Sequence, residues 1–334
     1  MVKAVLTFFR EVFRKVISII RTLLLYTIVI TILLTILSLV SGFVFNGDGN
    51  ENYIKERVIR NEGGQDKIVI AQLSGLILSD SNQTVLGTTN TIISPDKFQR
   101  IFAQIKRDPL VKALIIDINS PGGSPVASDR IFEMITNFKR ETGIPVVFLM
   151  GDMTTSGGYY IASAANHIVA NPATLTGSIG VIMETYNLEK LYEKLGVSKT
   201  TFKKGEYKDI LNESRPITEE ENEIIETLNE NTYNLFISRV ASGRNLPEEN
   251  IRNIANGQIY SGRQAKDLQL VDSLGNQDEA LYQAKLLANL ERFQVVEYKF
   301  SSLFTDLFGE TNGSLSFSSL LRVILQPKNL YQQY

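Results

Sequence analysis

The sequence predicts an α/β fold with a sheet of parallel strands and flanking helices, preceded by an N-terminal transmembrane helix. Between about residues 67 and 195, short apolar runs typical of buried strands alternate with helical patterns, as they do in parallel sheets. Two of the strand-to-helix turns are rich in glycine, at residues 119–123 and 155–158. In a parallel sheet such turns gather at the carboxyl ends of the strands, where ligands bind.

Local patterns predict where the strands and helices lie. Apolar runs predict strands at residues 67–78, 111–118, 145–150, 167–170 and 179–183. Helices are expected at about residues 95–106, 126–140, 187–195, 217–241 and 277–290, with a further helix that begins near residue 246. Ser94 before Pro95 is a typical helix start, and Thr218 with Glu221 has the spacing of a capping box.

The N-terminal residues have the pattern of a membrane anchor. Residues 1–21 contain five cations and one anion, which is typical of a basic helix on a membrane surface. Residues 22–45 carry no charge over 24 positions, long enough to cross a hydrocarbon core of roughly 30 Å. A cleaved signal peptide is the alternative, but the run is long and lacks a clear A-x-A site. The cations place the N-terminus in the cytoplasm and the bulk of the protein outside it.

Composition excludes several kinds of chemistry. The 334-residue chain has a net charge of −2, so nothing in its overall charge indicates nucleic-acid binding. It contains no cysteine, which removes thiol nucleophiles, cysteine-ligated zinc and disulfides. Its single histidine, His167, excludes a multi-histidine metal site. Because His167 opens a short apolar strand, we interpret it as a structural histidine.

Ser156 is the candidate nucleophile. It stands at a strand-to-helix turn with Gly157 and Gly158 behind it, and such a turn exposes the hydroxyl while glycine lets a substrate approach the backbone. The first N–H groups of the following helix, with a glycine N–H of residues 119–123, can bind an oxyanion. Two tight turns selected only for packing are the alternative. Since imidazole is not expected as the base, a lysine, a carboxylate or the α-amine remains.

Six motifs together resemble the signal peptide peptidase A family. They lie, in the family's order and spacing, at residues 119–123, 155–160, 174–181, 205–209, 260–265 and 270–275. The resemblance implies the crotonase-like fold shared with the Clp protease, and hydrolysis of peptides near the membrane by a serine nucleophile with a lysine base. It also implies the site: nucleophile Ser156, general base Lys208, lysine-orienting hydroxyl Ser178, and oxyanion donors Gly123 and Gly157. Gly122 stays open as an alternative to Gly123.

A lysine acts as a base only when it is neutral. The ordinary lysine pKa of about 10.4 must fall by roughly three units, and burial is the available cause. A carboxylate that contacts the amine would oppose this fall, so we expect Glu206 and Asp209, which flank Lys208, to point away from it. The implied chemistry needs no metal and no organic cofactor.

The resemblance also implies an organisation and partners. We expect a basic interfacial segment at 1–21, a transmembrane anchor at 22–45, a linker at 46–66, a peptidase domain at 67–300 and a C-terminal tail at 301–334. Cleaved signal peptides are the expected substrates, in a homo-oligomeric ring of eight copies where Lys208 serves Ser156 of a neighbour. The alternatives are a Clp-class peptidase acting on membrane proteins, a crotonase-like acyl-CoA enzyme and a non-catalytic membrane scaffold.

Overall fold

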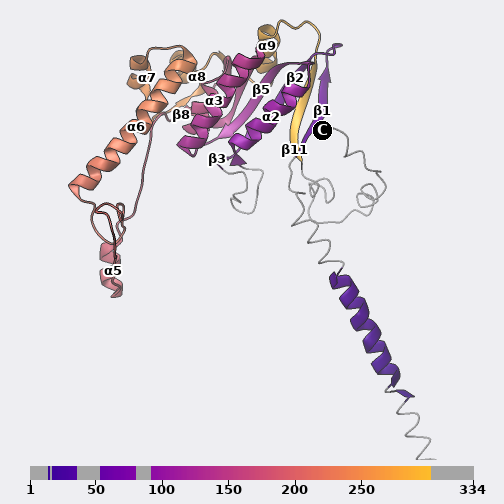
Figure 1. Ribbon diagram of the computed structural model, residues 1–334. Helices are drawn as coiled ribbons and strands as arrows, with labels where there is room; N and C mark the ends of the chain where they lie inside the picture. The colour runs from indigo at the N-terminus through magenta and orange to yellow at the C-terminus, as the bar shows by residue number, and fades with distance from the viewer. Residues whose placement is uncertain (1–13, 16, 36–52, 80–91, 302–334) are drawn as a thin grey trace, which may run out of the picture. The chain divides into compact units, whose positions relative to one another are not determined.

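The computed structural model describes residues 14–15, 17–35, 53–79 and 92–301 (Figure 1). It divides into two units, one made of Met1–Lys55 and Phe300–Tyr334 and one made of Glu56–Lys299. Most of the expected interfacial segment, the end of the expected anchor and nearly all of the C-terminal tail lie outside the described residues.

An apolar helix is the longest described element of the first unit. It spans Ile17–Thr35, its most apolar window has a mean hydropathy of 2.3, and none of that window is buried. By length and composition this helix can cross a membrane. A signal sequence near the N-terminus would have the same length and composition. Whether it is retained, and its direction across a membrane, stay predictions.

A nine-stranded sheet forms the centre of the second unit. Along the sheet the order is β1 (Tyr53–Asn61), β11 (Gln294–Ser301), β2 (Lys67–Ser74), β5 (Val111–Ser120), β6 (Val146–Thr155), β7 (His167–Ala170) and β10 (Ser273–Leu274). The pairs from β11 to β10 are all parallel. β8 (Leu175–Gly177) pairs with β6, and β9 (Ile259–Ser261) with β8; β3 (Leu76–Ile77) and β4 (Ile92–Ile93) form a small separate sheet. The predicted α/β class with a parallel sheet is confirmed.

The second unit also contains helices, several of which pack against the sheet. They are α2 (Pro95–Arg107), α3 (Pro125–Thr142), α4 (Gly157–Ala162), α5 (Glu189–Leu195), α6 (Glu219–Arg244), α7 (Glu248–Ile254), α8 (Gly262–Asp267) and α9 (Gln277–Leu287). α9 packs Ala280, Leu281 and Ala284 into the cluster that contains Ile70 and Ile115 of β2 and β5. Successive strand residues point to opposite faces, so the alternate residues of these strands face away from α9.

Two helix starts show the expected caps. The Ser94 hydroxyl accepts a hydrogen bond from Lys97 N at the start of α2, and Pro95 is its first residue. At the start of α6, Glu221 N donates to Thr218 Oγ1 (3.2 Å) while the Glu221 carboxylate accepts from Thr218 N (3.0 Å). The capping box predicted from these two residues is therefore confirmed.

Three segments differ from the sequence prediction. Residues 179–183 form no strand; the strand lies at β8 instead, because the chain leaves the sheet where Ser178 adopts a φ of 51°, and Ile182 is 83% exposed. β6 continues beyond residue 150 because its second half pairs with β8 after its first half pairs with β7. In the segment expected to be a linker, residues 53–61 form the edge strand β1, where Arg57 pairs with Glu297 of β11 at 2.8 Å.

The segment between β8 and α6 extends away from the sheet and carries α5 near its end (Figure 1). We call residues 181–218 the arm. Much of its apolar surface is exposed in a single chain; these side chains are Ile182, Met183, Tyr186, Leu191, Leu195, Val197, Phe202, Tyr207 and Ile217. Lys208 lies in this arm.

Candidate active site

Ser156 occupies a strained turn between β6 and α4. Its φ of 51° and ψ of −123° are rare for a residue with a side chain, at a cost of about 1–3 kcal/mol. The surrounding backbone holds it there: Ser156 N donates to Gly177 O at 2.8 Å, and Ser156 O accepts from Tyr160 N at 2.9 Å. Strain of this kind that the structure maintains is common at functional sites.

The two glycine-rich turns lie against each other. A Cβ atom placed on Gly122 would lie 2.8 Å from Gly157 N and 3.1 Å from Ser156 Oγ. A Cβ atom placed on Gly157 would lie 2.5 Å from Ser128 Oγ and 3.3 Å from Gly123 N. Only glycine leaves the room that these approaches need, so the expected convergence of the two turns is found in the structure.

The backbone amides of the two glycine-rich turns differ in whether they already donate a hydrogen bond. Gly122 N donates to Ser120 Oγ at 3.1 Å, so this amide is occupied. Among the described residues, neither Gly123 N nor Gly157 N has a hydrogen-bond acceptor. Gly123 itself is fixed by its bridge to Ile77, beside the Ser124 N to Ile77 O bond of 2.7 Å. Of Gly122 and Gly123, only Gly123 therefore has an amide without an acceptor among the described residues.

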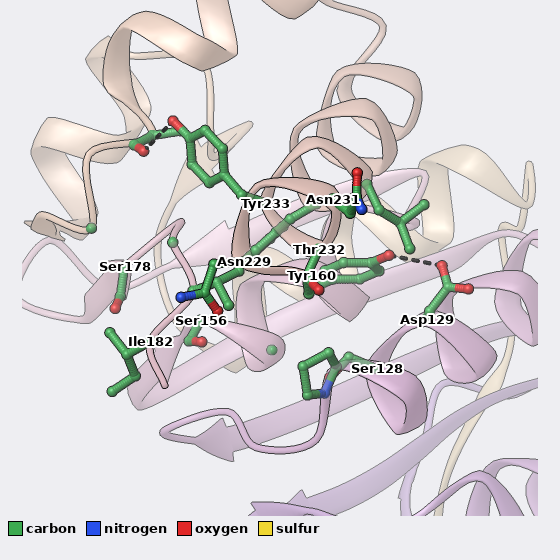
Figure 2. A pocket seen from close by; sticks show the side chains of 18 of the residues that line it. Ser128, Asp129, Ser156, Tyr160, Ser178, Ile182, Asn229, Asn231, Thr232 and Tyr233 are labelled. Atoms are coloured by element: carbon green, nitrogen blue, oxygen red, sulfur yellow. Dashed lines mark hydrogen bonds between the residues drawn. The ribbon is translucent and has the colours of Figure 1, made fainter. Parts of the chain in front are cut away.

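Ser178 is brought beside Ser156 by strand pairing. Thr155 of β6 is the partner of Gly177 of β8, and each serine directly follows one of these residues. Both serines have a φ of 51°, and Ser178 N donates to Gln258 O at 2.8 Å. Their hydroxyls line one cavity (Figure 2).

That cavity has a volume of about 1430 Å³. Gly123, Ser156, Gly157 and Ser178 all line it, so the structure brings four of the predicted site residues together. The other walls come from the start of α3, the beginning of the arm and the middle of α6. Val126, Ile182 and Leu235 are exposed apolar side chains among its lining.

Lys208 does not line the cavity of its own chain. Its side chain is exposed, and among the described residues its amine forms no hydrogen bond or ion pair. In a single chain the Lys208 amine is therefore not buried, which differs from the expectation from the sequence. The neighbouring Asp209 pairs with Lys203 (2.5 Å) and Arg215 (3.1 Å) instead of Lys208, as expected.

His167 has a structural environment. Its Nε2 lies 2.9 Å from Ser273 Oγ, between β7 and β10. Burial lowers the pKa of His167, while the Asp272 and Glu279 carboxylates oppose that shift. It is not a lining residue of the Ser156 cavity, so its structural interpretation is confirmed.

One polar cluster beside the cavity was not predicted. Tyr160 of α4 donates its hydroxyl to Asp129 of α3 at 2.7 Å (Figure 2), and Arg239 of α6 donates to the same carboxylate at 2.8 Å. Burial and the Asp129 contact raise the pKa of Tyr160 well above its ordinary value. The cluster ties together the three helices around the cavity. Its residues are far apart in the sequence, so no local pattern indicates it.

Nothing in the described ranges points to a metal centre. Within them, no group of three or more histidine, aspartate or glutamate side chains could hold a metal ion. The side chains at the cavity suit acyl transfer by a serine hydroxyl.

Comparison with known proteins defines a class: the chain is a serine peptidase. The model described as "Peptidase family S49" matches residues 138–291, which include Ser156, Ser178 and Lys208. A Synechocystis sp. protein provisionally named a protease is 40% identical over 67% of this chain and 76% of its own length. The chain belongs to peptidase family S49.

Other relatives carry related names. An Enterococcus faecium protein provisionally named signal peptide peptidase SppA is 34% identical over 74% of this chain and 71% of its own length. Serine protease SPPA of Arabidopsis thaliana chloroplasts is 37% identical over 71% of this chain, but the match spans 35% of that longer protein. The resemblance to the signal peptide peptidase A family is thus confirmed. Among solved structures, a mutant of the membrane-bound stomatin-specific protease 1510-N with a substrate peptide has 17% identity and a TM-score of 0.46, over 71% of this chain and 94% of that one.

Proposed function

We propose that this protein is a membrane-anchored peptidase that degrades cleaved signal peptides and other short hydrophobic peptides with a Ser156–Lys208 dyad. The observation that carries the proposal is the strained Ser156 turn, where a hydroxyl and two unengaged amides, Gly123 N and Gly157 N, line one cavity. A nucleophile beside free backbone donors is what acyl transfer requires.

The proposed reaction follows the usual two halves of acyl transfer. The neutral Lys208 amine takes the Ser156 proton as Oγ attacks the peptide carbonyl, and Gly123 N and Gly157 N bind the oxyanion. The Lys208 ammonium then donates its proton to the leaving amine, which frees one peptide fragment and leaves an ester on Ser156. Water, deprotonated by Lys208, hydrolyses that ester and restores the Ser156 hydroxyl.

We propose that Lys208 enters the cavity of a neighbouring copy. In a single chain the Lys208 side chain is exposed, and so are many apolar side chains of the arm that carries Lys208. A second copy that covers the arm would bury both these side chains and the amine, and burial disfavours the ammonium form. Ser178 of the receiving chain would then accept or donate a hydrogen bond to the amine without adding charge. A closed ring of such head-to-tail contacts gives every copy one complete site. The family resemblance implies eight copies.

The substrate class is supported by two features. Exposed apolar side chains line the cavity beside Ser156, which suits hydrophobic peptide side chains. An N-terminal helix able to cross a membrane would hold the site where signal peptides are released, with the N-terminus in the cytoplasm and the catalytic unit outside.

Product mapping tests the proposed function. The full chain in detergent is incubated with a panel of signal peptides, folded membrane proteins and acyl-CoA thioesters, and the products are identified by mass spectrometry. We expect cleavage of signal peptides by the wild type and by Lys204→Ala, an exposed arm lysine that serves as the matched control for Lys208→Ala. Signal-peptide cleavage that persists in Ser156→Ala or Lys208→Ala would contradict the dyad. Cleavage confined to membrane proteins would contradict the substrate class.

A further inference from the structure

One arginine ties the turn that carries Lys208 to the beginning of α6. The Arg215 guanidinium donates to Asp209 through Nε (3.3 Å) and Nη2 (3.1 Å), and to Glu221 through Nη1 (2.7 Å) and Nη2 (2.5 Å). Asp209 directly follows Lys208, and Glu221 is in the first turn of α6. Arg215 therefore bridges the Lys208 turn and the helix whose middle lines the cavity.

The Asp209 carboxylate is fully engaged. Besides Arg215, Lys203 Nζ contacts Asp209 Oδ1 at 2.5 Å, and Asn212 Nδ2 donates to Asp209 Oδ2 at 3.3 Å. Lys203 Nζ also donates to Glu206 O at 2.6 Å, which closes the turn just before Lys208. Arg215 and then Lys203 hold the pKa of Asp209 well below its usual range, so the carboxylate stays ionised and paired.

The charges of this cluster cancel. Two cations, Lys203 and Arg215, face two anions, Asp209 and Glu221. A carboxylate beside a lysine stabilises the ammonium form, and Asp209, as the next residue in the chain, could reach the Lys208 amine if it were released. The cluster prevents that contact: in the described residues Asp209 pairs with Lys203 and Arg215, and the Lys208 amine has no ion-pair partner.

We infer that Arg215 is a positioning residue for the general base: it holds the Lys208 turn on α6 and keeps the Asp209 carboxylate away from the Lys208 amine. The inference rests on the proposed role of Lys208. The bridge explains how Lys208 could act as a base although Asp209 is the next residue in the sequence.

Other charged residues lie close to Lys208 in the sequence, and none of them is replaced when only Arg215 changes. In the turn these are Lys203, Lys204, Glu206 and Asp209, of which Asp209 is the one whose pairing the substitution alters. The cavity that Lys208 is proposed to enter is lined by further charged groups: Asp129, Arg130, Glu226 and Glu230. Of these, Asp129 already accepts from Arg239. A difference between the wild type and an Arg215 variant therefore reports on the bridge.

The test measures kcat/KM against pH for signal-peptide cleavage by the full chain in detergent. Activity rises with pH as the base loses its proton. In Arg215→Gln we expect this ascending limb to move to higher pH by about half to one unit, with the high-pH plateau retained, because a released carboxylate favours the ammonium. The double variant Asp209→Asn/Arg215→Gln should return the limb toward the wild-type position. Arg100→Gln removes a guanidinium from the Asp96 ion pair on α2 and should leave the limb in place.

Three outcomes overturn the inference. They are an unmoved limb in Arg215→Gln, a uniform loss at every pH, and a double variant no different from Arg215→Gln. If Arg215→Gln does not fold, Asp209→Asn alone tests the inference. The ascending limb of kcat/KM for Asp209→Asn should lie at the same pH as that of the wild type or at a lower pH. An ascending limb at higher pH refutes the inference. Full activity of Lys208→Ala would instead overturn the proposed function, whatever Arg215 does.

Discussion

Gly157→Ala tests whether the junction of the two glycine-rich turns forms the catalytic centre. A Cβ atom on Gly157 would lie 2.5 Å from Ser128 Oγ, whereas ordinary contact begins at about 3.4 Å. The shortfall is about 0.9 Å, and Ser128 is buried, so the Ser128 hydroxyl, the turn or α3 has to move. Overpacking of this kind typically costs about 1–3 kcal/mol. A displacement of about 1 Å at a catalytic centre can reduce the rate about 100-fold.

A second substitution turns this clash into a controlled experiment. Ser128→Ala removes the clashing oxygen and breaks only the 3.0 Å hydrogen bond from Ser128 Oγ to Ser124 O, a loss of about 1 kcal/mol. We expect Ser128→Ala to retain most of the activity, Gly157→Ala to lose about 100-fold in kcat/KM, and the double variant to recover a large part of that loss.

The assay combines kcat/KM for a fluorogenic hydrophobic peptide with urea unfolding of the same preparations. Recovery in the double variant shows that the distance between α3 and the Ser156 turn controls the rate. If Gly157→Ala is as active as the wild type, or the double variant is no better than Gly157→Ala, the reasoning from this contact is refuted.

Three further predictions concern stability and assembly. Burial lowers the pKa of His167 in the folded state, so below about pH 6.5 the unfolded chain binds more protons than the folded chain. The free energy of unfolding therefore falls as the pH decreases through that range. In urea unfolding, His167→Gln should make the free energy of unfolding depend less on pH there. Thr218→Ala removes the capping box of α6 and should lower the free energy of unfolding by about 1 kcal/mol, with Thr227→Ala on the exposed surface of the same helix as the control. Phe202 is 95% exposed in one chain, so Phe202→Ser should leave the fold unchanged by circular dichroism but reduce the oligomeric mass by light scattering; an unchanged mass contradicts a role for the arm in assembly.

Much of the fold could be predicted because its signals are local. The apolar run before Ser156 and the glycines after it mark a strand, a turn and a helix within a few residues, and the structure places β6 and α4 there. The caps at Ser94 and Thr218 are equally local. Strand extension could not be predicted, because the end of β6 is held by pairing with β8, about twenty residues further along the chain, and with Ser120 at the end of β5.

The site was predictable where glycine was required. A Cβ atom on Gly123 would meet the backbone of Ile77 and one on Gly157 would meet the Ser128 hydroxyl, and positions that require glycine leave a visible pattern in the sequence. The Asp129–Tyr160–Arg239 cluster leaves none, because its members come from three different helices. The choice between Gly122 and Gly123 also needed coordinates, since it depends on the bond from Gly122 N to Ser120 Oγ.

Lys208 marks the limit of reasoning from residues alone. Only the family resemblance distinguishes it from Lys203 and Lys204 nearby, since all three look like surface lysines. A single chain leaves it exposed on the arm, and in the proposed mechanism the burial that a base needs comes from a second copy. Arg215 pairs with Asp209, which lies six positions earlier in a segment that is not helical. No regular spacing in the sequence therefore indicates this ion pair.

The most direct test of the shared dyad is complementation between two inactive chains. Ser156→Ala keeps Lys208, and Lys208→Ala keeps Ser156. In a ring mixed at random from equal amounts, half of the Ser156 sites are intact, and half of these receive an intact Lys208, so about one quarter of the wild-type activity should return. Each variant alone should be inactive, and mixing either one with Ser156→Ala/Lys208→Ala should restore nothing. Recovery to about a quarter in the co-expressed, co-purified assembly is the result we predict; a mixture as inactive as its components would contradict a dyad shared between copies.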